Sequence, residues 1–113
     1  MKPIDNADLC WLAGLLEGEG CFRTNKTSAN IQLVMTDRDV VERAANIFNS
    51  IVPCVIVREY NHSQRDSKIW QITLTGSYAS FWMSMLWNHM GARRSKEIRQ
   101  ALLRSSLGRQ GNS

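Results

Sequence analysis

The stretch that decides the fold runs from residue 12 to residue 20 and reads Leu12-Ala13-Gly14-Leu15-Leu16-Glu17-Gly18-Glu19-Gly20. Leucine and alanine recur at helical spacing from Leu9 to Leu16, which predicts a helix that begins near Asp5. Gly18 and Gly20 are predicted to end it. A glycine inside a helix costs about 1 kcal/mol relative to alanine. Three glycines in nine residues therefore need a reason beyond helix stability.

Gly14 and Gly18 lie four residues apart, so they share one helix face, with Ala13 close by. That face carries almost no side-chain bulk and allows another backbone to approach closely. Packing within the chain is one interpretation, and a helix-to-helix contact between two copies is the other. We expect the second, with the dimer interface formed by Leu12, Ala13, Gly14, Leu15 and Gly18.

Two acids, Glu17 and Glu19, stand where this helix is predicted to end. A carboxylate at the negative end of the helix dipole is disfavoured by about 0.3–1 kcal/mol, so stability alone would favour lysine or arginine there. Two exposed glutamates at a frayed helix end are the simple interpretation. Carboxylates beside unpaired helix carbonyls also gather the hard oxygen ligands that suit Mg²⁺ or Ca²⁺.

The rest of the chain alternates strand and helix patterns in the order α-β-β-α-β-β-α-α. Apolar residues at every second position predict antiparallel strands with one polar face, and stripes at helical spacing predict helices. We therefore expect an α+β fold, a four-stranded antiparallel saddle-shaped sheet with helices on one face only. The expected elements after the first helix cover residues 21–27, 30–35, 37–50, 54–60, 68–75, 77–89 and 93–103, with a flexible tail from about 105.

One face of the predicted sheet carries polar side chains. It is either a solvated surface or a surface that reads bases, because Arg, Asn and Gln are the side chains that bond base edges in the major groove. The residues expected there are Arg23, Asn25, Asn30, Gln32, Arg58, Tyr60, Gln71 and Thr73. Three basic residues near turns, Lys26, Arg65 and Lys68, are added as candidate DNA contacts, since such residues touch phosphates without reading sequence.

Composition limits the possible functions. The chain has 113 residues, 43% hydrophobic and 21% charged, which indicates a single domain over residues 1–113. No apolar run approaches the ~20 residues of a membrane span, and the N-terminus does not resemble a secretory signal. Three cysteines without paired spacing favour a reducing, cytoplasmic or other intracellular setting over secretion.

Residues 92–113 hold six basic residues and one acid, which suggests either a nucleic-acid-binding segment or a solvated helix end.

The nine residues resemble the defining motif of the LAGLIDADG homing endonucleases, with Leu-Glu-Gly-Glu-Gly in place of Ile-Asp-Ala-Asp-Gly. The order of strands and helices after the motif also agrees, so the resemblance covers nearly the whole chain. The motif occurs once, which in this family implies a homodimer. The resemblance implies cleavage of both strands of a long pseudo-palindromic DNA site, leaving 3′ overhangs, with Mg²⁺ as cofactor and Ca²⁺ or Mn²⁺ as substitutes. No small-molecule substrate and no membrane partner are expected.

The resemblance also implies roles for single residues. Glu19 falls on the metal-binding acid, Gly18 beside it offers a carbonyl oxygen, and Glu17 falls on an acid with a supporting role. Asp37 is expected either to orient water near the scissile phosphate or simply to cap a helix. Either Arg94 or Lys96 is expected to stabilise charge on the phosphate.

Two other functions remain open at this point. A non-cleaving DNA- or RNA-binding protein of the same fold, such as a transcription regulator or an intron maturase, would use the sheet face without the acids. An interaction protein would use the small-residue helix only to dimerise. Both acids of the motif are Glu rather than Asp, and the chain is short for the family, which is why a non-cleaving relative stays in consideration.

Overall fold

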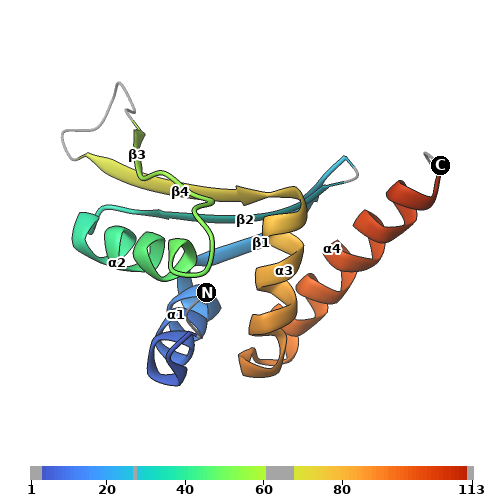
Figure 1. The fold of residues 1–113 in the computed structure, drawn as a ribbon, viewed down its shortest axis with the longest axis horizontal. Coiled ribbons are helices and arrows are strands. Elements are labelled where there is room, and N and C mark those ends of the chain that lie inside the picture. The colour runs from blue at the N-terminus through green and yellow to red at the C-terminus, as the bar shows by residue number, and fades with distance from the viewer. Residues whose placement is uncertain (1–3, 27, 61–67, 112–113) are drawn as a thin grey trace.

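The computed structural model describes residues 4–26, 28–60 and 68–111, with backbone alone for Asn25, Tyr60 and residues 106–111. Its strands form one sheet in the order β1-β2-β4-β3, and all neighbours are antiparallel. The four α-helices lie on one side of the curved sheet, so the α+β prediction is confirmed (Figure 1). The elements are α1 Asn6–Glu19, β1 Gly20–Asn25, β2 Ser28–Met35, α2 Arg38–Asn49, β3 Arg58–Tyr60, β4 Ile69–Thr75, α3 Gly76–Leu86, the short 3₁₀ helix η1 Trp87–His89 and α4 Ala92–Gly111.

A single hydrophobic core joins the inner face of the sheet to the helices. The strand register aligns Phe22, Ile31 and Leu74 on that inner face, and all three are buried. Beneath them Trp82 of α3 meets Phe48 of α2 edge to face, with ring centroids 5.0 Å apart. Burying such large aromatic side chains contributes much of the free energy that holds helices to sheet.

Both ends of α1 agree with the prediction. Asp5 caps the helix as expected, because its side chain accepts a hydrogen bond of 2.9 Å from the backbone N–H of Ala7. The other end was predicted at Gly18 and Gly20, and the last helical residue is Glu19, directly before Gly20. Gly20 is the C-cap residue, and its backbone N–H donates to the carbonyl of Leu16. The acids therefore belong to the last turn of a formed helix.

The strand predicted over residues 54–60 is also shorter than expected, since β3 covers only Arg58–Tyr60. The side chain of Asn49, at the end of α2, provides the reason. Its Oδ1 accepts the backbone N–H groups of Cys54 and Val55 at 2.8 and 3.0 Å, and its Nδ2 donates to the Val55 carbonyl at 3.0 Å. These backbone groups satisfy their hydrogen bonds on Asn49 instead of in a strand ladder.

The last helix is longer than predicted. α4 was expected to end near Leu103 and to give way to a tail at about residue 105, whereas the helix continues to Gly111. Within it Ile98, Ala101 and Ser105 are buried, because α4 packs against α3, β1 and β2. Among the residues that the structure describes, no helix combines the length and the hydropathy of a membrane span.

Candidate active site and nucleic-acid interface

Helix α1 has two contrasting faces. Leu12 and Leu16 have no exposed surface and Ala13 has 2%, so this side belongs to the core of the chain. Gly14 and Gly18 are exposed, and a Cβ added to either would meet nothing within 4 Å. Of the residues predicted for the dimer interface, Leu12 and Ala13 are buried inside the chain and Leu15 is half-buried, and the interface itself stays a prediction. The part left bare is the stripe through Gly14 and Gly18.

The acids are placed by a tight junction between α1 and β1. A Cβ on Gly20 would lie 2.8 Å from both the Cδ2 atom and the carbonyl oxygen of Leu16, a distance that real Cβ atoms do not tolerate. Glycine is thus required where the chain leaves the helix and enters the sheet at once. As a result Glu19, the last residue of α1, is exposed directly at the start of β1.

Glu19 and Asp37 line the same depression, which has a volume of about 340 Å³. Asp37 follows β2, the neighbour of β1 in the sheet, so the topology brings together two acids that are distant in sequence. The remaining lining residues are Val34, Met35, Thr36 and Ile69.

The carboxylate of Asp37 is not used to cap α2. Asp37 is the N-cap residue by position, and its backbone carbonyl accepts hydrogen bonds from Val40 and Val41. Its side chain makes no cap hydrogen bond. An acid is electrostatically favoured at a helix N-terminus, and the carboxylate is left free of a cap hydrogen bond beside the depression.

Glu17 and Arg94 connect the last turn of α1 to the first turn of α4. The Arg94 Nε donates to the Glu17 carbonyl at 3.0 Å, and its Nη1 pairs with the Glu97 carboxylate at 2.9 Å. The Glu17 carboxylate accepts the backbone N–H of Gly91 at 3.2 Å. A Cβ at Gly91 would lie 2.7 Å from Glu17 Oε1, so this glycine makes room for the contact.

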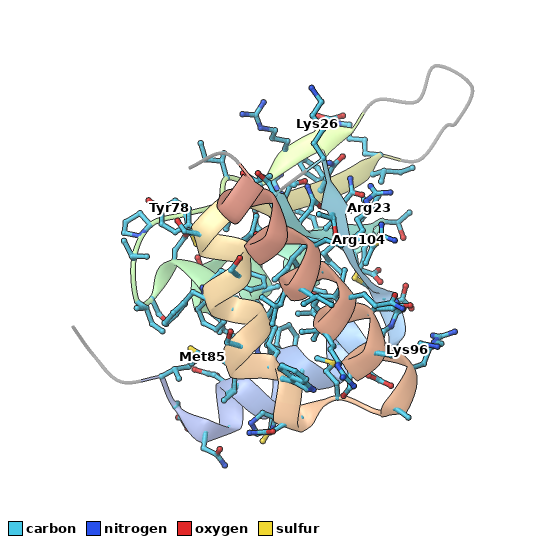
Figure 2. All side chains as sticks on the ribbon, turned by 90° about the vertical axis from the view of Figure 1, so that its right-hand side faces the viewer. Arg23, Lys26, Tyr78, Met85, Lys96 and Arg104 are labelled. Atoms are coloured by element: carbon cyan, nitrogen blue, oxygen red, sulfur yellow. The ribbon has the colours of Figure 1, made fainter. Side chains whose placement is uncertain are left out.

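These contacts separate the two basic candidates. The side chain of Arg94 is only 12% exposed, and it donates to a helix carbonyl that would otherwise be unpaired. Cations commonly stabilise a helix C-terminus in this way. Lys96 is exposed and extends from α4 in Figure 2. Sequence reasoning missed the parts of Gly91 and Glu97 in this contact, because no motif links them to a helix more than seventy positions earlier.

The strand register places the predicted polar set on one face. Arg23 is opposite Asn30, Gln32 is opposite Thr73, and Gln71 is opposite Arg58. Asn25 and Tyr60 share that face by register alone. This is the face that no helix covers in Figure 1. Lys26 and Lys68 are exposed beside it, whereas Arg65 lies outside the described residues.

Side chains on this face differ in accessibility. Arg23 and Arg58 are exposed, and Gln32, Gln71 and Thr73 are half-buried. Asn30 retains only 8% exposure, and its Oδ1 has no hydrogen-bond partner among the described atoms. A base could reach Asn30 only if neighbouring side chains moved.

Comparison with family models and with curated proteins gave no match. Solved structures do match. The homing endonuclease I-CvuI in complex with its target, in the presence of calcium, superimposes with a TM-score of 0.65 and 14% sequence identity, over 88% of this chain and 68% of that chain. The same endonuclease with the I-CreI target and magnesium, its DNA not cleaved, gives a TM-score of 0.66 at 14% identity, with the same coverage. The chain therefore has the homing-endonuclease fold that the motif predicted.

The contact between Arg94 and α1 generates the first prediction. Arg94→Ala should lower the free energy of unfolding by about 1–3 kcal/mol, because it leaves the Glu17 carbonyl without a partner. Urea unfolding measures the loss. Arg93→Ala removes the same charge from an exposed neighbour and should change stability by less than about 0.5 kcal/mol. Equal losses in the two variants would contradict the assignment.

Proposed function

We propose that this chain is a homodimeric, divalent-metal-dependent endonuclease that cuts both strands of a long, pseudo-palindromic DNA site and leaves 3′ overhangs. One observation carries the proposal: an exposed acid, Glu19, ends a helix whose outward face is bare at Gly14 and Gly18, and it shares a depression with Asp37. The solved structures that share the fold are endonucleases in complex with DNA, which supports the same substrate class.

The bare face of α1 supports association of two copies. Gly14 and Gly18 each cost helix stability, yet among the described residues nothing outside the helix's own backbone lies within 4 Å of a Cβ added to either. A second backbone at close range would use that space. Symmetric dimers place the same residue of both copies about a twofold axis. Contact through this stripe would therefore bring the two Glu19 side chains toward each other.

The donor set of the depression fits a magnesium ion. Glu19 and Asp37 offer only oxygen ligands, and Mg²⁺ typically binds through one or two carboxylates, water and substrate phosphate. In the part of the chain that the structure describes, no three acidic, histidine or cysteine side chains form a metal-binding group. Such a small donor set is consistent with a metal site whose remaining ligands come from the substrate and from the second copy of the chain. A bound divalent ion would stabilise negative charge on the phosphate and lower the pKa of a water molecule.

The surrounding residues have distinct tasks in this proposal. Glu19 holds the metal together with the carbonyl of Gly18, and Asp37 orients the attacking water. Arg94 acts indirectly, by fixing the turn that carries Glu19 through the carbonyl of Glu17. Lys96, whose side chain is exposed, is the candidate for contact with the phosphate.

The polar sheet face is proposed to lie in the major groove. Its side chains come from all four strands, so they can follow several successive base pairs. Lys26 and Lys68 at its margin would contact phosphates, which positions the duplex without reading its sequence. Binding should accordingly weaken steeply as salt is raised.

The dimer contact gives the second prediction. Gly14→Leu should leave the protomer folded and even favour the helix by roughly 0.8 kcal/mol, because leucine is the better helix former and its Cβ would meet nothing within 4 Å. It should convert the proposed dimer to a monomer in sedimentation equilibrium. Asn46→Leu places the same leucine side chain at an exposed site on α2 and should leave the dimer intact. A Gly14→Leu protein that dimerises like the parent would contradict the proposed contact.

The acid gives the third prediction. DNA flanking the reading frame, cloned in a plasmid, should be linearised in Mg²⁺ and remain intact in EDTA. Glu19→Gln should lower the cleavage rate by about a hundredfold or more, the loss typical of removing one group that stabilises the transition state, while DNA binding persists. Glu42→Gln is the matched control, since Glu42 is paired with Arg38 on α2 at 2.8 Å.

The outcome also decides between cleavage and binding alone. If Glu19→Gln and the parent protein cut equally, the acid is not part of the site. If neither cuts but both bind the same DNA, the chain is a non-cleaving binding protein of this fold, and the endonuclease proposal is wrong.

A further inference from the structure

Two side chains on the open sheet face are already bonded to each other. Arg23 on β1 donates from Nη2 to the Oε1 of Gln32 on β2, at 2.6 Å. Arg23 is exposed and Gln32 is half-buried. Among the described residues, the ion pairs present do not involve Arg23, so Gln32 is its side-chain partner on this face.

The bond determines what the pair can offer a ligand. Gln32 has one carbonyl oxygen and one amide NH₂ group, and its oxygen already accepts a hydrogen bond from Arg23. Arg23 has only N–H donors. Because Arg23 engages the acceptor of Gln32, the pair presents mainly donors to a molecule that approaches the sheet. The guanidinium is also held in one orientation, which reduces the entropy lost on binding.

Base pairs differ in the acceptors they show in the major groove. Guanine presents two neighbouring acceptors, O6 and N7, whereas adenine pairs one acceptor with a donor, and thymine and cytosine offer no such pair. Resting on the proposed function, we propose that Arg23, oriented by Gln32, binds the O6 and N7 atoms of a guanine in the DNA site. The twofold symmetry of a dimer places this guanine once in each half-site.

Another glutamine on the same face provides an internal comparison. Gln71 donates from Nε2 to the Oγ1 of Thr73 at 3.1 Å, so its carbonyl oxygen remains available as an acceptor. Gln71 therefore does not favour guanine. The same residue type has opposite hydrogen-bonding character at the two positions, because its partner differs.

A phosphate contact is the competing role for Arg23. Arg23 and Arg104 line a depression between β1 and α4 with a volume of about 190 Å³, and Figure 2 places both on one edge of the molecule. Glu97 lines the same depression, but its carboxylate is paired with Arg94, so it does not decide between the two roles. The guanidinium of Arg23 is bonded to Gln32 on the sheet face. This observation favours the base.

Selection from a randomised duplex library, in Ca²⁺ to allow binding while limiting cleavage, tests the proposal. The parent protein should enrich a guanine at one position of each half-site. Arg23→Ala, which removes the N–H donors, should lose that preference, and Gln32→Ala should weaken it. Gln71→Ala should keep it. For the parent protein, 7-deazaguanine at that position should weaken binding by about 5- to 150-fold, and inosine, which retains O6 and N7, should bind normally.

Each result separates this inference from the proposed function. If the parent protein enriches no sequence, the site-specific function fails and the guanine contact with it. If the parent enriches a site and Arg23→Ala enriches the same guanine, the function stands and the inference is wrong. Arg23→Ala binding that weakens equally for all sequences would assign Arg23 to phosphate and would also overturn it.

Discussion

The structure depends on how helix α1 ends. Leu16 and Gly20 are in such close contact that only glycine fits, so the chain passes from the last helical turn into the first strand without a linker. One side of the helix supplies Leu12 and Leu16 to the core, and the other side is bare. Both the core and the exposed acid follow from this one junction. With a longer connection between α1 and β1, the sheet would no longer determine where Glu19 lies.

The contact with Arg94 completes that junction from the other end of the chain. A helix C-terminus leaves carbonyls unpaired, and two acids in its last turn increase the negative charge there. The guanidinium of Arg94 donates a hydrogen bond to the carbonyl of Glu17, and the backbone N–H of Gly91 donates one to the Glu17 carboxylate. Glu17 is therefore satisfied within the protein, while Glu19 remains exposed to solvent. Two acids of the same type, separated by one residue, thus have different environments because their neighbours differ.

Sequence alone predicted the order of the elements, the helices on one side and the shared polar face, because apolar periodicity determines which face of each element is buried. It could not predict the short β3, since the cause is a side-chain amide, that of Asn49, which competes with the strand. Nor could it predict which residues of α1 are buried in the core and which are exposed. Whether Leu12 and Ala13 face the core or a partner depends on where the sheet lies. The roles of Arg94 and Gln32 depend on single hydrogen bonds between distant elements.

The most direct test of the central claim uses a native cysteine. Cys10 is exposed one helical turn before Gly14, whereas Cys54 is half-buried and its burial raises the pKa of its thiol, which slows its reaction with maleimides. If two copies meet along this stripe, a short bifunctional maleimide should join them through Cys10. The cross-linked dimer should form in the parent and in Cys54→Ser, and disappear in Cys10→Ser. A protein that stays uncross-linked in the presence of duplex DNA, or that cross-links equally without Cys10, would contradict the account.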